Sequence, residues 1–143
     1  MITSFNVDHD FLEKGFYLAD ETRGIYTYDL RFKRPNRGDY LSYGAIHTIE
    51  HLFAVDIRTK SEVKDAMVYF GPMGCRTGFY LLLMDIPYEK ALKATYDCLK
   101  KMDFSSIPGA TRQECGNYLE HDIKDAEREV KEYIKVLDGI IKG

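Results

Sequence analysis

The sequence is short of the features that mark membrane proteins and nucleic-acid-binding proteins. Its longest apolar run covers residues 79–84, whereas a membrane-spanning helix needs about 20 apolar residues. It has 20 basic and 23 acidic residues, a net charge of −3. It therefore lacks the basic excess that binding to nucleic acid or to an anionic membrane requires. These absences predict a soluble globular protein that binds neither partner.

Tryptophan is absent, and cysteine is limited to Cys75, Cys98 and Cys115. The first residues carry no basic stretch followed by an apolar one, so we expect no signal peptide and a cytoplasmic location. In a reducing compartment, an odd number of cysteines argues against disulfide bonds and leaves reactive, metal-binding or core roles. We expect Cys98, which lies in an amphipathic segment, to be a packing residue.

The chain contains enough apolar sequence for one domain with a core, with 143 residues of which 45% are hydrophobic. Alternating polarity and turn residues predict a short extended segment over residues 4–9 and several β-strands. The predicted strands are residues 15–19, 25–32, 66–70 and 79–85. The last of these is apolar on both faces, so we expect it to be central in its sheet. Helical spacing of apolar residues predicts helices over residues 44–60, 88–102 and 119–141.

Strand 25–32 carries an acidic and a basic residue on the same predicted face. Asp29 and Arg31 share this face with Ile25 and Thr27. Such a pair usually marks a solvated edge. If this face is instead buried, the charged pair indicates a nearby anion or polar ligand, because buried charge needs a partner.

Helix 44–60 contains the pattern His-x-x-Glu-His at His47, Glu50 and His51. Four residues advance an α-helix by about 400°, so His47 and His51 lie about 40° apart on its surface, one turn above the other. Two imidazoles in this arrangement can bind one divalent metal. Glu50 lies about 60° from His47 and can reach a molecule bound beside that metal.

Two histidines do not complete a metal site, and the candidates for a third ligand are Glu114 and Cys115. A thiolate with two imidazoles leaves room for water or substrate, the open arrangement of catalytic Zn²⁺ or Fe²⁺. We expect His121, in the first turn of helix 119–141, to cap that helix or to be solvated. His9 is either a surface histidine or a contact to a ligand.

Cys75 lies in a segment rich in turn-forming residues, which predicts a tight loop over residues 71–78 between two strands. One interpretation is a small apolar residue that fills a corner of the fold. The other is a rigidly held thiol that a ligand can reach. The flanking glycines favour the second interpretation, because they allow a close approach of the backbone.

Five segments in register identify the chain as similar to the S-ribosylhomocysteine lyase (LuxS) family, and together they span nearly its whole length. They are residues 4–9, 28–36, 47–52, 71–81 and 114–122. The resemblance implies an α+β fold, with an antiparallel β-sheet packed by helices in a single domain over residues 1–143. It also implies a homodimer with two identical active sites at the subunit interface.

The family's site residues fall on matching positions of this chain. The resemblance implies that His47, His51 and Cys115 bind the metal, with water or a substrate oxygen in the fourth place. Cys75 and Glu50 would be the catalytic acid–base pair. The residues implied in substrate binding are Ser4 and His9, reaching across from the partner subunit, together with Arg31 and Arg58.

The reaction implied by the resemblance is cleavage of S-ribosylhomocysteine to homocysteine and 4,5-dihydroxy-2,3-pentanedione, the precursor of autoinducer-2. The carbonyl group moves from C1 to C2 to C3 of the ribose, and β-elimination then expels homocysteine. The implied metal is Fe²⁺, which Zn²⁺ or Co²⁺ can replace, and no organic cofactor is expected. The enzyme would thus serve methionine metabolism and quorum sensing.

Three other functions are compatible with the histidine motif alone. A metalloprotease would use Glu50 to activate water, but it would need a downstream Glu ligand and a larger chain. A deformylase-like ferrous hydrolase would need the order His-Glu-x-x-His, with its cysteine earlier in the chain. A structural metal site in a binding module would need a fourth protein ligand, and we expect His9 and His121 to have other roles.

Overall fold

The computed structural model describes residues 9–108, 111–113, 116–117 and 119–143. In this part of the chain, four strands and three α-helices follow one another in the order β1, β2, α1, β3, β4, α2 and α3, which is typical of an α+β fold. The strands are β1 (Gly15–Thr22), β2 (Ile25–Arg31), β3 (Met67–Pro72) and β4 (Gly78–Met84). The helices are α1 (Tyr43–Thr59), α2 (Tyr88–Lys100) and α3 (Ile123–Lys142), and a single 3₁₀ turn covers Lys64–Ala66.

The strands form one antiparallel sheet in the order β1-β2-β4-β3. Two hairpins, β1–β2 and β3–β4, meet along β2 and β4, so Tyr28 of β2 lies opposite Leu81 of β4. The prediction that the strand near residues 79–85 is central is therefore confirmed. The antiparallel α+β class is confirmed as well.

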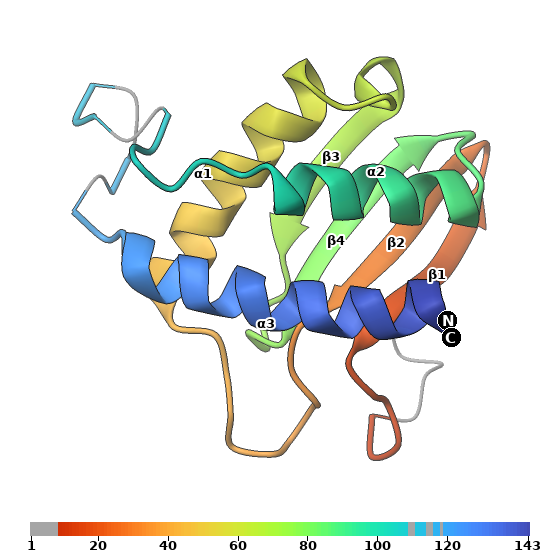
Figure 1. Ribbon diagram of the computed structural model, residues 1–143, viewed down its shortest axis with the longest axis horizontal. Helices are drawn as coiled ribbons and strands as arrows, with labels where there is room; N and C mark the ends of the chain where they lie inside the picture. Colours follow the sequence, from red (N-terminus) through yellow and green to blue (C-terminus); the bar gives the residue numbers. More distant parts are fainter. Residues whose placement is uncertain (1–8, 109–110, 114–115, 118) are drawn as a thin grey trace.

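The three helices cover one face of the sheet (Figure 1). Because successive side chains of a strand point to opposite faces, alternate residues of β2 and β4 supply the core beneath these helices. Ring contacts join the layers. The ring centroids of Phe53 in α1 and Phe70 in β3 lie 4.5 Å apart, and those of Phe16 in β1 and Tyr88 in α2 lie 5.5 Å apart. The other face of the sheet carries no helix of the described chain.

The register identifies the side chains on this uncovered face. Asp29 pairs with Tyr17 on one side and Tyr80 on the other. Leu82 pairs with Tyr69, which is 49% exposed. The uncovered face is therefore aromatic and partly apolar around a central charged residue.

Helix α1 forms where the apolar spacing predicts it, within one residue at each end. Ser42 caps it, because its side-chain oxygen accepts a hydrogen bond from the Ala45 N–H. Ile49, Phe53 and Ile57 recur one turn apart and are at most 1% exposed. Burial of this stripe fixes the rotation of the helix and so decides which way its histidines face.

Helix α3 begins at Ile123, four residues after the predicted start at residue 119. Asp122 is the residue before the helix, and its carboxylate accepts a hydrogen bond from the Asp125 N–H. Asp122 also bonds to α1, since its backbone nitrogen lies 3.0 Å from the Thr48 hydroxyl oxygen and 3.2 Å from the Gly44 carbonyl oxygen.

Other predicted boundaries also differ from the structure. Strand β1 runs to Thr22 instead of residue 19, and α2 ends at Lys100 instead of residue 102. The predicted loop over residues 71–78 is shorter, because Gly71 and Pro72 still belong to β3 and pair with β4. Of the predicted extended segment 4–9, only His9 lies within the described residues, where it begins a turn. No helix in the described parts of the chain is long and apolar enough to cross a membrane.

Candidate metal and catalytic site

His47 and His51 face each other on successive turns of α1, as the spacing predicts. Their ring centroids lie 4.8 Å apart and their Nε2 atoms 3.2 Å apart. Both side chains are half-buried. The motif therefore brings two imidazole nitrogens to one point at the surface of the helix.

The opposite nitrogen of each ring meets a backbone carbonyl. His47 Nδ1 lies 2.7 Å from the Glu120 carbonyl oxygen, and His51 Nδ1 lies 2.9 Å from the Pro108 carbonyl oxygen. A carbonyl can only accept, so each Nδ1 carries the proton and donates it. In a neutral ring the lone pair is then on Nε2, the tautomer that metal-binding histidines adopt.

The distance between the two Nε2 atoms fits a shared metal ion. Two neutral imidazoles would place their lone pairs against each other at 3.2 Å, which is repulsive without a cation between them. Ligands about 2.0–2.1 Å from a tetrahedral zinc ion are roughly 3.3 Å from one another. The donor set and the fixed tautomers therefore suit a divalent metal at this position.

Cys115, the predicted third ligand, lies outside the described residues, and so does the other candidate, Glu114. The described chain on either side of Cys115 does return to the histidines. Pro108 precedes it and contacts His51, whereas Glu120 follows it and contacts His47. The segment that carries Cys115 in the sequence is thus held to α1 at both ends.

A third histidine, His121, lies beside the pair and was missed by the sequence analysis. Its ring stacks on His47 with centroids 3.9 Å apart and planes 16° from parallel. The possible ligand atoms of His47, His51 and His121 all lie within 4.8 Å of one another. The prediction that His121 caps α3 or is solvated is wrong, because Asp122 takes the capping position and His121 is half-buried before it.

The surroundings of His121 disfavour its charged form. Burial, followed by the charges of His47 and His51, lowers the pKa of His121 to about 4. Its Nδ1 lies 3.1 Å from the Thr48 hydroxyl oxygen, and its buried Nε2 has no hydrogen-bond partner among the described residues. A capping aspartate at Asp122 was the sequence signal that could have placed His121 outside the helix.

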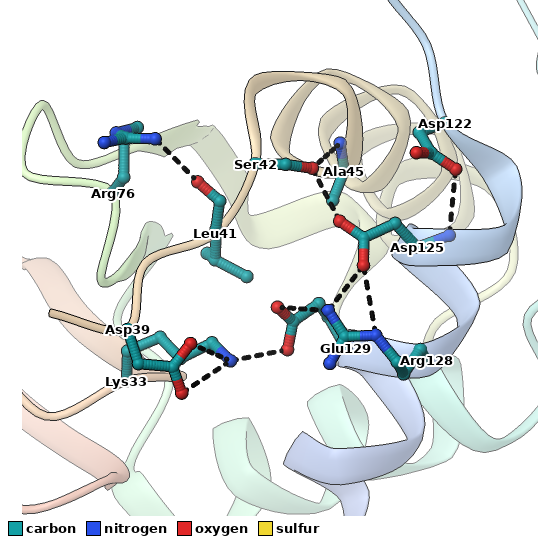
Figure 2. A network of polar contacts seen from close by, with 10 residues as sticks. All are labelled: Lys33, Asp39, Leu41, Ser42, Ala45, Arg76, Asp122, Asp125, Arg128 and Glu129. Atoms are coloured by element: carbon teal, nitrogen blue, oxygen red, sulfur yellow. Dashed lines mark hydrogen bonds and ion pairs between the residues drawn. The ribbon is translucent and has the colours of Figure 1, made fainter.

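A network of polar contacts holds the start of α1 against α3 (Figure 2). The Ser42 hydroxyl lies 2.6 Å from an Asp125 carboxylate oxygen, and Asp125 also pairs with Arg128. The hydrogen bond from Ser42, and then those from Arg128, keep the pKa of Asp125 below its usual value. Because α3 follows directly after the segment of Glu120 and His121, this contact sets the position of that segment relative to His47.

The same network includes a buried ion pair at the end of β2. Lys33 lies 2.9 Å from the Glu129 carboxylate of α3 and 3.2 Å from Asp39. The side chain of Glu129 is 2% exposed. Burial lowers the pKa of Lys33, but hydrogen bonds to Glu129 and Asp39 outweigh it and raise the pKa overall. The chain after β2, the start of α1 and helix α3 are thus joined by one network (Figure 2).

Cys75 is exposed in the short connection between β3 and β4. The neighbouring Arg76 has a φ of 61°, in the left-handed region, and exchanges backbone and side-chain hydrogen bonds with Leu41. Its guanidinium lies 4.7 Å from the ring centre of Tyr43, the first residue of α1. The loop of Cys75 is therefore fastened beside the end of α1 from which His47 is one turn away.

Asp29 and Arg31 form an ion pair at 2.7 Å and are 5% and 2% exposed. The interpretation as a solvated edge is therefore wrong, because both residues of the pair are buried. Burial raises the pKa of Asp29, although Arg31 opposes this. Asp29 Oδ1 and Arg31 Nε have no hydrogen-bond partner among the described residues. One acceptor and one donor on this face of the sheet can therefore still bond to a further group.

The remaining predicted site residues are spread more widely. His9 is close enough to Asp29 for its charge to oppose the rise in the pKa of that carboxyl group that burial causes. Ser4 lies outside the described residues. Glu50 is half-buried on α1 next to His51. Arg58 is exposed in the last turn of α1, about 10 Å along the axis from His51, and the described structure does not bring it to the site.

Comparison with known proteins gives matches over almost the entire chain. The family model described as S-Ribosylhomocysteinase (LuxS) matches residues 2–142. An S-ribosylhomocysteine lyase of Borreliella afzelii is 41% identical, covering 97% of this chain and 93% of that protein. One of Phocaeicola vulgatus is 42% identical over 99% and 92%, and one of Clostridium acetobutylicum is 37% identical over 97% and 92%. The resemblance drawn from five sequence segments is thereby confirmed, and the chain belongs to the S-ribosylhomocysteine lyase (LuxS) family.

Proposed function

We propose that this protein is a metal-dependent S-ribosylhomocysteine lyase. It cleaves S-ribosylhomocysteine to homocysteine and 4,5-dihydroxy-2,3-pentanedione. The observation that carries the proposal is the pair of Nε2 atoms of His47 and His51, 3.2 Å apart and fixed by carbonyls behind each ring, in a chain of this family. The proposed compartment is the cytoplasm, where thiols stay reduced.

The proposed ligands of the metal are His47, His51 and Cys115, with Fe²⁺ as the native ion and Zn²⁺ or Co²⁺ as substitutes. When bound, the ion supplies a Lewis acid beside the migrating carbonyl group. The stacking geometry supports Cys115 over His121 as the third ligand. The nitrogen lone pairs of an imidazole lie in its ring plane, and the nearly parallel planes of His47 and His121 keep the lone pairs of these two rings from converging on one point.

Cys75 and Glu50 are the proposed acid–base residues. Each carbonyl shift removes a proton from a carbon next to a carbonyl group and returns a proton to the neighbouring carbon. Cys75 can accept this proton only as a thiolate, and it sits exposed in a connection fastened beside the start of α1. Glu50, next to His51 on α1, moves protons between substrate oxygens and assists the elimination of homocysteine.

The proposed assembly is a homodimer with residues 1–143 as a single metalloenzyme domain in each subunit. The sheet face without helices supports it, because Tyr69 is 49% exposed there and Leu82 lies opposite it. A solvent-exposed aromatic surface of this kind suits an interface between subunits. Ser4 and His9 of one subunit would reach the substrate of the other, and Arg31 and Arg58 would help to bind it.

A thiol-release assay on S-ribosylhomocysteine tests the proposed function. Ferrous-loaded protein, kept anaerobic, should release homocysteine, while metal-free protein should release none. Cys75→Ala is the matched control, because it should retain the metal and lose the activity. Folded, metal-loaded protein without thiol release would contradict the proposal and favour the hydrolase alternatives, in which Glu50 activates water.

A further inference from the structure

A buried hydroxyl lies between Arg31 and Cys75. The Thr77 Oγ1 atom is 2.7 Å from Arg31 Nη1 and 3.0 Å from Cys75 Sγ. Thr77 is 1% exposed and Arg31 is 2% exposed, whereas Cys75 is exposed. A positive charge that solvent does not reach is thus linked through a single hydroxyl to a thiol that solvent does reach.

The chemistry of the three groups fixes the direction of these hydrogen bonds. A guanidinium can only donate, so the Thr77 oxygen accepts from Arg31 and keeps its own hydrogen to give. The acceptors within reach are the Cys75 sulfur at 3.0 Å and the more distant Met73 sulfur at 4.0 Å. When Cys75 is a thiolate, the hydrogen points to it, because a hydrogen bond to an ion is stronger than a neutral one.

Both ends of this linkage are rigidly held. The second terminal nitrogen of Arg31 donates to Asp29 at 2.7 Å, which fixes the guanidinium. The Thr77 carbonyl accepts hydrogen bonds from the backbone N–H groups of Phe32 and Lys33, each at 2.9 Å. The next residue, Gly78, passes so close to β2 that a Cβ there would overlap the Leu30 carbonyl oxygen. The Thr77 hydroxyl is therefore held in place by protein contacts.

We propose that Thr77 is the positioning residue that stabilises and orients the Cys75 thiolate, by passing the charge of Arg31 to the sulfur through its hydroxyl. Donation by Arg31 polarises the Thr77 O–H and makes it a better donor. The inference rests on the proposed role of Cys75 as the base. It assigns to Thr77 a function that its neighbours in the turn cannot supply, since the Arg76 guanidinium is directed to Leu41 and to the Tyr43 ring.

The test measures the alkylation rate of Cys75 by iodoacetamide in metal-loaded protein at mildly acidic pH, where the rate follows the thiolate fraction. Peptide mass spectrometry assigns the modified residue. Thr77→Val removes the hydroxyl at nearly constant volume and should slow alkylation about fivefold or more. Thr77→Ser, which keeps the hydroxyl, should stay within about twofold of the wild type.

Thr95→Val is the matched control. Thr95 is fully buried in α2 and its Oγ1 has no hydrogen-bond partner among the described residues, so this change should leave alkylation unaltered. If Thr77→Val is much less stable than Thr95→Val, Thr77→Ala replaces it as the hydroxyl-free variant. A loosened turn would make the already exposed Cys75 still more accessible and would accelerate alkylation, so it cannot produce the slower rate that the proposal predicts. An unchanged or faster rate without the hydroxyl overturns the proposal.

The lyase assay separates this inference from the proposed function. Thr77→Val should lower kcat in parallel with the alkylation rate and leave KM nearly unchanged. Slower alkylation in a protein without lyase activity would reject the proposed function and keep the role of Thr77. If the protein is an active lyase but Cys75 is alkylated at the same rate with and without the Thr77 hydroxyl, the role of Thr77 is rejected and the proposed function stands.

Discussion

The Nε2 atoms of His47 and His51 lie 3.2 Å apart, and the Nδ1 atom of each ring is held by a carbonyl of one later segment of the chain. These carbonyls belong to Pro108 and Glu120. The two histidines thus join α1 to a connection that has little other regular structure among its described residues. Occupation of the site by a metal would fasten this connection further, so metal binding and local folding are coupled.

The identity of the third ligand can be tested by metal content. Cys115→Ala should weaken metal binding at least tenfold, because a ligand is lost and not merely a supporting contact. His121→Phe should retain the metal, since a phenyl ring preserves the stack on His47. Elemental analysis after dialysis against a chelator of known affinity measures both. Full metal content in Cys115→Ala together with loss in His121→Phe would replace the His₂Cys set by three histidines.

A close approach of α1 to the chain before α3 offers a second test. At Gly44, a Cβ would lie 2.9 Å from the Asp122 Cβ and 3.3 Å from its backbone nitrogen. Gly44→Ala should therefore push this segment away from His47, lower the free energy of unfolding by about 1–3 kcal/mol and weaken metal binding.

Gly139→Ala is the control for that change, because nothing lies within 4 Å of a Cβ at Gly139 in α3. It should raise the free energy of unfolding, by up to about 1 kcal/mol, because alanine favours a helix over glycine. Denaturant titration and a metal-binding isotherm on the same samples make the comparison. Equal stability and equal metal affinity of the two variants would show that the contact of Gly44 with Asp122 does not position the site.

The pH dependence of stability should report the contact between Asp125 and Ser42. The folded-state pKa of Asp125 is lowered, first by the hydrogen bond from Ser42 and then by Arg128. A lowered pKa means that the unfolded chain takes up the proton first. The contribution of Asp125 is therefore complete above its unfolded pKa of about 3.9 and is lost as the pH falls through its lower folded value.

Asp125→Asn should be less stable than the wild type by a constant amount from about pH 7 to pH 5, and this difference should shrink below about pH 4. Urea unfolding at several pH values measures it. Glu127→Gln is the control, because among the described residues Glu127 forms an ion pair only with the exposed Lys131, at 3.5 Å on the same helix. A difference between Asp125→Asn and the wild type that stays constant down to pH 3 would assign it to packing and not to charge.

The elements of this fold were predictable where periodicity was strong, and α1 is the clearest case. Its apolar stripe places it within one residue at each end, and this placement fixes the geometry of His47 and His51. Strands β2 and β4 were predictable for the same reason, because β-branched and aromatic residues alternate or run continuously there.

The sequence was less informative where contacts between distant segments decide the structure. The late start of α3 depends on hydrogen bonds from Asp122 to Thr48 and Gly44, which no local pattern reveals. His121 was assigned to the wrong environment as a consequence. The burial of Asp29 and Arg31 was left open because it depends on neighbouring strands and on Thr77, far away in the sequence.

Mixing of two inactive variants tests whether the site is shared between subunits. Cys75→Ala lacks the proposed base, and His9→Ala lacks a residue proposed to reach the substrate of the partner. A heterodimer of the two contains one site with both defects and one with neither. A refolded equimolar mixture should therefore recover about a quarter of wild-type activity, because half of the dimers are mixed and each has one intact site of two.

Each variant refolded alone is the control. If the mixture is as inactive as the two controls, although mass spectrometry shows mixed dimers, the site lies within a single chain and His9 acts on its own subunit.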